Sequence, residues 1–281
     1  VGFTSILTTS EQKLSLKNLI GICLTHSRGK MRNFKVEICY DGTNYHGYQY
    51  QINAITVQEV LEKAVCTVLN TDVRINGCSR TDTGVHARQY FFSVLHSSSI
   101  STEGFLRGLN TLLPKDIAIL SCEEVDESFH ARFNSTGKRY VYRIWNGKVR
   151  NPFYENRALM YQYPLDLDKL RECASLFIGT HDFTSFCSTA SEVEDKVRTV
   201  KKIDITKNGD MVDITFIGDG FLHNMVRIMV GTMIFYNEGK FTKEQILDMF
   251  SCPDRKKAGK TAFGGGLYLD KVYYDDFDIK G

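Results

Sequence analysis

The alternation of strand-like and helix-like segments between residues 34 and 273 most constrains the fold of this chain. In segment 57–69 the apolar residues recur three and one apart, which predicts an amphipathic helix with one buried face. The other segments of the first half read as strands at 34–40, 73–76, 89–94 and 117–122 and a helix at 105–112. This half of the chain is therefore predicted to be α+β.

The second half repeats the same kind of pattern. Its predicted strands are 140–145, 200–206, 211–217 and 267–273, and its predicted helices are 167–177, 222–235 and 243–250. Only four prolines occur in the chain, and the connections are short, so a long flexible linker is not expected. We predict two similar α/β halves, residues 31–136 and 137–281, that pack with a cleft between them.

Composition excludes several classes of protein without identifying a substrate. Hydrophobic residues make up 42% and charged residues 24% of the chain, both near the globular average, which argues against disordered, collagen-like and coiled-coil proteins. The net charge of +2 is too small to indicate a polyanionic partner, although a cleft can concentrate positive charge. No apolar stretch approaches the length that spans a bilayer.

The cysteines and histidines do not indicate a metal site. None of the eight cysteines forms a C-x-x-C pair, so they read as reduced core residues of a cytosolic protein. The seven histidines are not clustered, and we expect no metal. We also expect no nucleotide cofactor, because the glycines at 264–266 lack the spacing of a phosphate-binding loop and read as a turn.

Residues 1–30 are left out of the fold prediction. They are rich in Ser, Thr and Leu, with Glu11 as their acidic residue, and two interpretations stay open. The segment is either a weak organellar presequence or a non-native or upstream extension before a start at Met31.

Segment 77–87, GCSRTDTGVHA, contains the first candidate for catalysis. Asp82 follows the predicted strand 73–76, on a connection whose residues tolerate unusual backbone angles. This predicts a carboxylate at a strand end, facing a cleft. The alternative is an Asx-turn residue whose carboxylate bonds its own backbone.

Arg227 needs an anionic partner. It lies in the middle of a helix that is apolar on nearly all sides and is therefore predicted to be buried. A guanidinium cannot be neutralised by deprotonation, so a carboxylate or phosphate must meet it. The partner is either an unrelated acidic residue in a structural ion pair or Asp82 across the cleft, which would then be held in its charged form.

The strand around residues 138–143 alternates basic and aromatic side chains: Lys138, Arg139, Tyr140, Tyr142 and Arg143. Such a strand suits a nucleic acid, because aromatic rings stack on exposed bases and cations meet phosphates. The alternative is an ordinary edge strand with solvated charges. Tyr140 is the candidate for stacking on a base, and Tyr142 lies on the same face by the period of two.

Two other polar residues receive structural interpretations. His86 has no Ser or Cys nucleophile in a triad order and reads as a hydrogen-bonded structural histidine. Asp41 is the one rival acid for a mechanism with two carboxylates, and its segment looks like a turn.

Taken together, these segments resemble the TruA family of tRNA pseudouridine synthases from residue 31 onward. The matching segments, in order, are YDGTNYHG at 40–47, SRTDTGVHA at 79–87, FHARF at 129–133, KRYVY at 138–142, HDFTSF at 181–186, HNMVRIMVG at 223–231 and GLYL at 266–269. The resemblance implies a central, mostly antiparallel sheet with a basic cleft between two α/β halves. Tyr48 departs from the family, which commonly has Trp there, and the segment 263–265 replaces one that usually contains proline.

The resemblance also implies the chemistry and the partners. Asp82 would be the catalytic aspartate, Arg227 its ion-pair partner and Tyr140 the aromatic residue against the target base. Arg80 would enter the RNA, and Lys138, Arg139 and Arg143 would bind it. The implied enzyme is a cytoplasmic homodimer that needs no cofactor and isomerises uridines 38, 39 and 40 of the tRNA anticodon stem-loop. Two alternatives stay open, a non-catalytic RNA-binding or RNA-folding module and a synthase acting on another RNA.

Overall fold

The structure is a computed structural model that describes residues 30–275. Its strands are β1 (Arg32–Tyr40), β2 (Asn76–Gly77), β3 (His86–His96), β4 (Ile117–Val125), β5 (Gly137–Trp145), β6 (Leu159–Met160), β7 (Gly179–Asp182), β8 (Val197–Asn208), β9 (Met211–Gly218) and β10 (Leu267–Tyr273). Its α-helices are α2 (Val57–Leu69), α3 (Thr102–Leu112), α4 (Leu167–Ser175), α5 (Met225–Asn237) and α6 (Lys243–Ser251). Short 3₁₀ turns include η4 (Gly264–Gly266), where the sequence predicts a turn.

All ten strands belong to one sheet. The strand order is β4-β1-β3-β10-β5-β9-β8-β7, with β2 paired to β3 and β6 paired to β5. The β3–β10 and β5–β6 pairs are parallel, whereas the other pairs are antiparallel. The prediction of an α+β fold with a mostly antiparallel sheet is confirmed.

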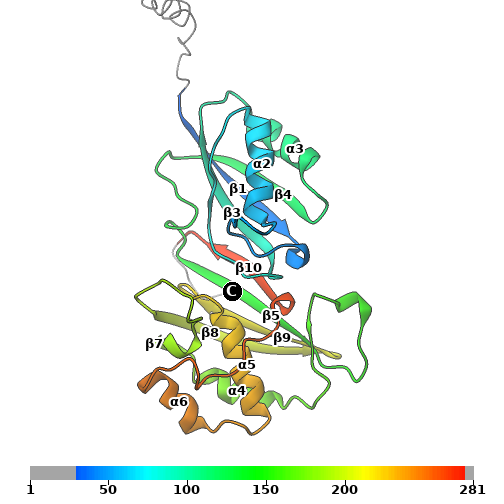
Figure 1. Cartoon of the computed structure of the whole chain (residues 1–281), viewed down its shortest axis with the longest axis vertical. Helices are drawn as coiled ribbons and strands as arrows, with labels where there is room; N and C mark the ends of the chain where they lie inside the picture. Colours follow the sequence, from blue (N-terminus) through cyan, green and yellow to red (C-terminus); the bar gives the residue numbers. More distant parts are fainter. Residues whose placement is uncertain (1–29, 276–281) are drawn as a thin grey trace, which may run out of the picture.

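The last strand joins the two parts of the sheet. In Figure 1, β1, β3 and β4 lie with α2 and α3 in the upper part, β5, β8 and β9 lie with α4, α5 and α6 in the lower part, and β10 runs between them. Leu269 of β10 pairs with Ala87 on one side and with Tyr140 on the other. The start of β3, which follows the Asp82 loop, is therefore one strand away from Tyr140.

The helices begin where local capping allows. The Thr56 side chain caps α2 by accepting from the Glu59 N–H, and Thr242 and Gln245 form a capping box at the start of α6. Helix α5 starts three residues later than the predicted start at 222, because Asn224 has left-handed backbone angles (φ 62°) that a helix cannot contain. Asn224 thereby becomes the residue before the helix, next to the site.

Segment 73–76 is not the predicted strand. Only Asn76 and Gly77 pair with β3, so the ladder is two residues long. The residues before them are held by α2 instead, since Glu62 accepts from the Ile75 N–H at 3.3 Å and pairs with Arg74 at 2.8 Å. The alternation of apolar and polar residues comes from packing against a helix.

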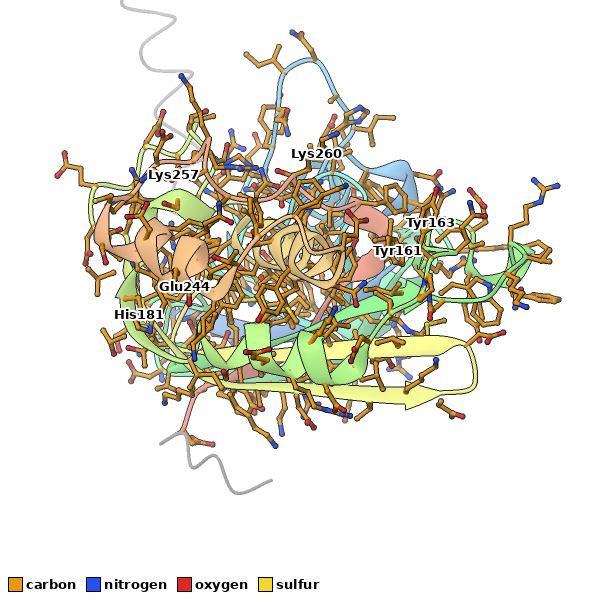
Figure 2. The ribbon with its side chains drawn as sticks, turned by 90° about the horizontal axis from the view of Figure 1, so that it is seen from below. Tyr161, Tyr163, His181, Glu244, Lys257 and Lys260 are labelled. Atoms are coloured by element: carbon orange, nitrogen blue, oxygen red, sulfur yellow. The ribbon has the colours of Figure 1, made fainter. Side chains whose placement is uncertain are left out.

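Helix α5 is the most enclosed helix of the lower part. Its buried residues run from Met225 to Ile234 and include the fully buried Thr232. Seen from below, α5 lies close to end-on in the interior, while the labelled Glu244 and Lys257 lie toward its periphery (Figure 2). An arginine in the first turn of such a helix must find its partners near the N-terminal end of the helix.

Candidate active site

A cleft of about 720 Å³ lies where the two parts of the sheet meet. Its lining comes from the loop around Asp82, from Lys138 and Tyr140 on β5, and from residues 221–227 at the start of α5. The predicted position of Asp82 facing a cleft is therefore present. Residues far apart in sequence meet here because β10 holds β3 beside β5.

At two glycines, the backbone of neighbouring segments packs closely against the loop that contains Asp82. Gly47 has φ +84°, and a Cβ there would stand 2.4 Å from the Thr81 carbonyl oxygen. On the opposite side a Cβ at Gly264 would stand 2.4 Å from the Thr83 carbonyl oxygen. Any larger residue at either position would push the loop away. The carboxylate is thus held on a backbone that packs against both parts of the chain.

Arg227 meets Asp82 directly. The Arg227 Nη1 lies 3.0 Å from Asp82 Oδ2, and both side chains are mostly buried, with 17% and 18% of their surfaces exposed. The Arg227 Nε donates to the Ala262 carbonyl oxygen at 2.8 Å, which fixes the direction of the guanidinium. The sequence left open whether Arg227 pairs with an unrelated acidic residue or with Asp82, and in the structure it pairs with Asp82.

Two residues that sequence reasoning missed complete this contact. Asn224 Oδ1 accepts from the Arg227 Nη1 at 2.6 Å, and His223 Nε2 lies 3.4 Å from Asp82 Oδ1. The available signal was an asparagine three residues before a buried arginine, since Asn tolerates the left-handed conformation. Both oxygens of Asp82 are therefore approached by nitrogen groups from the start of α5.

Tyr140 lies beside the carboxylate. Its hydroxyl is 3.2 Å from the Ser79 hydroxyl, and its ring packs edge-on against Phe221 with centroids 5.2 Å apart. Burial raises the pKa of Tyr140 far above its ordinary value, and the charge of Asp82 contributes to the increase. The phenol is neutral at physiological pH, which suits contact with an uncharged base.

The four RNA-binding candidates do not share one surface. Arg80 and Lys138 line the cleft with Asp82. Arg139 pairs with Asp270 at 2.6 Å and Arg143 with Asp213 at 3.2 Å, and neither lines the cleft. Arg139 and Arg143 lie on the other side of the sheet from Lys138, because odd and even positions of β5 point to opposite sides.

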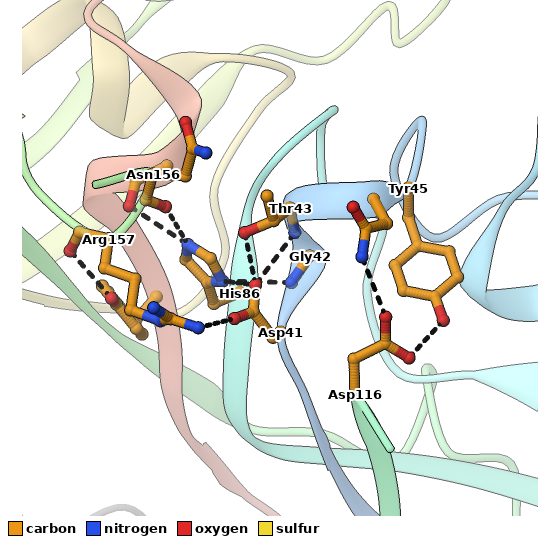
Figure 3. A network of polar contacts seen from close by, with 11 residues as sticks. Asp41, Gly42, Thr43, Tyr45, His86, Asp116, Asn156 and Arg157 are labelled. Atoms are coloured by element: carbon orange, nitrogen blue, oxygen red, sulfur yellow. Dashed lines mark hydrogen bonds and ion pairs between the residues drawn. The ribbon is translucent and has the colours of Figure 1, made fainter. Parts of the chain in front are cut away.

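The rival acid Asp41 belongs to a separate network, drawn in Figure 3. Its Oδ2 accepts from Arg157 at 2.7 Å, and its Oδ1 accepts from the Thr43 N–H and lies 3.1 Å from His86 Nδ1. Burial acts to raise the pKa of Asp41, but the hydrogen bonds from Thr43, together with nearby His86 and Arg157, outweigh it, so the pKa is lowered. Asp41 is a structural anion in a turn.

His86 has the structural role that the sequence predicts. It is 3% exposed, its Nδ1 accepts from the Gly42 N–H, and its Nε2 lies 2.8 Å from the Asn156 carbonyl oxygen. The ring thereby ties the turn after β1 to the connection that follows β5 (Figure 3). With both nitrogens engaged, it is not available as a general base.

Between residues 30 and 275, no group of three or more His, Cys, Asp or Glu side chains is arranged to hold a metal ion. In the same range, no helix has the length and apolar character that crossing a membrane requires.

A carboxylate paired with a buried arginine, beside a tyrosine in a cleft, is the arrangement that the resemblance to pseudouridine synthases implies. The chain matches the family model described as "tRNA pseudouridine synthase" over residues 38–134 and 173–275. It is 44% identical over 244 residues to "tRNA pseudouridine synthase A" of Thermoanaerobacter sp. (strain X514), covering 87% of this chain and 100% of that protein. A protein with the same description from Ruminiclostridium cellulolyticum is 43% identical over 245 residues, again 87% of this chain and 100% of the relative.

Among solved structures, a Cbf5-Nop10-Gar1 complex aligns with a TM-score of 0.34 and 10% identity, over 72% of this chain and 54% of that chain. The assignment to a family rests on the family model and the curated relatives. The chain belongs to the tRNA pseudouridine synthase family and is an isomerase with tRNA pseudouridine synthase activity.

Proposed function

We propose that this enzyme isomerises uridines 38, 39 and 40 of the tRNA anticodon stem-loop, with Asp82 as the catalytic residue. The observation that carries the assignment of Asp82 is its contact with Arg227, 3.0 Å between Nη1 and Oδ2, inside a cleft that is wide enough for a nucleotide. Arg227 binds Oδ2 of the carboxylate, and Oδ1, which lies 3.4 Å from His223 Nε2, is the oxygen that would act on the substrate.

The reaction rearranges atoms within one nucleotide. The bond from the sugar C1′ to N1 of uracil breaks, a bond from C1′ to C5 forms, C5 loses its proton, and N1 gains one. Asp82 can drive the first step by adding to the base, by attacking the sugar or by abstracting a sugar proton to give a glycal. The three routes place the same demand on the protein, which is an ionised carboxylate beside a base that has been flipped out of its stack.

The neighbours of Asp82 have distinct proposed roles. Arg227 orients the carboxylate, and Tyr140 presents a neutral ring to the uracil while Phe221 supports that ring. Arg80 contributes positive charge at the entrance and helps to extrude the base. Leu267, 5% exposed, adds apolar surface to the lining of the cleft, which helps to exclude water during the lifetime of the detached base.

We also propose the finer organisation of the protein. Residues 31–136 and 137–281 would form two similar halves, and two copies of the chain would associate as a homodimer in the cytoplasm. The family resemblance supports the dimer. Within residues 30–275, the cysteines at 39, 66, 78, 122, 173, 187 and 252 are free thiols, which supports a reducing compartment.

The proposal is tested by replacing the two aspartates separately. Unmodified tRNA is incubated with wild type, Asp82→Asn and Asp41→Asn, and pseudouridine is then mapped at single-nucleotide resolution. Asp82→Asn is expected to form no pseudouridine, whereas Asp41→Asn retains most of the activity because Asp41 lies in a different network.

Three outcomes contradict parts of the proposal. Equal product from wild type and Asp82→Asn would remove Asp82 from the chemistry. Loss of product only in Asp41→Asn, with unchanged thermal stability, would make the rival acid the catalytic one. Product at uridines outside the anticodon stem-loop would refute the proposed positions and leave the activity itself intact.

A further inference from the structure

Four cations line the cleft without a carboxylate partner. Arg80, Arg132, Lys138 and Arg198 are all part of the lining, and none of them forms an ion pair with any acidic residue in the range 30–275. Arg227 differs from them, since Asp82 already neutralises it. The cleft therefore contains more positive charge than its own residues balance.

The opposite face of the same strands is organised differently. There Asp270, whose side chain is 10% exposed, pairs with both Arg88 at 2.9 Å and Arg139 at 2.6 Å, and Asp213 pairs with Arg143. Cations of neighbouring positions on β5 are thus neutralised on one side of the sheet and left unpaired on the other. This contrast indicates that the anion for the cleft side comes from outside the protein.

Two of the unpaired cations, Lys138 and Arg198, lie on strands that flank β9, and Arg132, in the turn before β5, lines the same cleft. Lys138 of β5 pairs with Gly218 of β9, and Gly218 pairs with Val200 of β8, two residues after Arg198. A Cβ at Gly220 would stand 3.7 Å from Arg198 Cδ, so the turn after β9 lies against the arginine side chain. Lys138 and Arg198 both line the cleft, so their side chains face the same space.

Arg198 is oriented but not neutralised. Its Nη1 donates to the carbonyl oxygens of Asp195 and Val197, which holds the side chain at the start of β8. The nearby carboxylate of Asp219 is occupied elsewhere, because its oxygens accept from the Thr199 N–H at 3.1 and 3.2 Å. The guanidinium keeps donors for an external acceptor.

The three cations influence one another. Burial lowers the pKa of Lys138, and the positive charges of Arg132 and Arg198 lower it further. Three like charges that share a partly buried space are stabilised by an anion that accepts several hydrogen bonds at once. A phosphodiester has two charged oxygens, and arginine donates to such a group in a bidentate manner.

We propose that Arg132, Lys138 and Arg198 form a subsite for one backbone phosphate of the RNA strand, adjacent to the nucleotide whose base is isomerised. The proposal rests on the proposed function, in that RNA occupies the cleft. Lys138 is two residues from Tyr140, about 7 Å along β5, so the phosphate would be held close to the base contact. Fixing the backbone there keeps the sugar in place while the uracil detaches and turns.

The first measurement is the salt dependence of tRNA binding. The logarithm of the association constant falls with the logarithm of the salt concentration, and each lost phosphate contact makes this slope shallower by about 0.7 to 0.9. Because the three side chains share one phosphate, Arg132→Gln, Lys138→Gln and Arg198→Gln are each expected to reduce the slope by up to this amount, and the triple variant by about this amount. The control is Lys63→Gln, which removes the same charge from an exposed ion pair with Glu59 on α2 and should leave the slope unchanged. Thermal unfolding verifies that each variant is folded.

The second measurement locates the phosphate. A series of anticodon stem-loops carries one uncharged methylphosphonate linkage at successive positions around the target uridine. One linkage is expected to weaken binding by wild type, and the same linkage should weaken Arg198→Gln much less, since the contact is already lost. Slopes equal to that of Lys63→Gln, or a linkage effect of the same size in wild type and Arg198→Gln, would overturn the subsite.

Pseudouridine formation by wild type is measured on the same RNA and separates the two proposals. Product from wild type together with unchanged slopes in the variants would refute the phosphate subsite and leave the proposed function standing. Lowered slopes without product at uridines 38, 39 or 40 would support the subsite and refute the proposed target.

Discussion

The ion pair between Asp82 and Arg227 allows a quantitative test in the folded protein without RNA. Replacing Arg227 by Met removes the donor to Asp82 Oδ2 and also the donors to Asn224 and Ala262. Replacing Asp82 by Asn removes the negative charge and keeps the shape. A double-mutant cycle over Arg227→Met and Asp82→Asn isolates the charge–charge contribution from the other lost contacts.

The expected coupling follows from the geometry. For unit charges about 4 Å apart, an effective dielectric constant of about 20 gives an attraction of about 4 kcal/mol. The side chains are 17% and 18% exposed, so part of this attraction offsets the loss of hydration. We expect a coupling energy of about 2 kcal/mol in the free energy of unfolding. If the same interaction orients Asp82 in the transition state, Arg227→Met lowers kcat by about 30-fold.

Urea unfolding at pH 7 measures the stability of wild type, both single variants and the double variant. Arg255→Met is the matched control, because Arg255 is another half-buried arginine and donates to the Gly259 carbonyl oxygen and the Thr261 hydroxyl rather than to a carboxylate. Its effect should add to that of Asp82→Asn within about 0.5 kcal/mol. If the effects of Arg227→Met and Asp82→Asn on the free energy of unfolding also add within this limit, the two side chains are not energetically coupled and the reasoning is refuted.

Three further variants test other features of the structure. Gly47→Ala forces a side chain into a φ of +84° and toward the Thr81 carbonyl oxygen, so urea unfolding should show a free energy of unfolding lower by about 1 to 3 kcal/mol. An unchanged midpoint would contradict the close packing of Gly47 against the Asp82 loop. Burial, and then the charge of Arg32, lowers the pKa of His96, so the folded state binds fewer protons than the unfolded chain and stability declines as pH falls below about 6.5. His96→Phe should flatten that decline in acid titrations, and an unaltered pH dependence would count against it. Lys138→Met should raise the melting temperature of the RNA-free protein at pH 7, because the lowered pKa means that the charged form is disfavoured by folding. This gain should shrink as pH rises toward 10.5, and a gain that is constant with pH would show that charge is not its cause.

Part of the site was predictable because its causes are local. The turn residues around Asp82 force the chain to bend after a buried segment, so the carboxylate was expected at an element end. The need of Arg227 for an anionic partner follows from the apolar sequence of its helix alone. Sequence reasoning failed for segment 73–76, where packing against α2 produces the same alternation as a strand.

The sequence showed that basic residues alternate along β5, but it did not show which of them would line the cleft. A period of two separates Lys138 from Arg139 and Arg143, yet both faces of the strand carry cations, so the pattern does not indicate which face is the cleft. That depends on Asp270 and Asp213, which neutralise one face, and on α5, which lies over the other. Asn224 and His223 were missed because the predicted helix included them.

The sequence by itself determined the class of the fold and, through its resemblance to known relatives, the family of the enzyme. It also singled out Asp82 and Arg227 as candidates, since turn chemistry and the cost of a buried charge act within short segments. Which acid meets Arg227, and which cations stay unpaired for a phosphate, only the tertiary structure decided. Asp82 and Arg227 are 145 residues apart in the chain. They meet because β10 is inserted between β3 and β5, and strand order in a sheet is set by packing over the whole molecule.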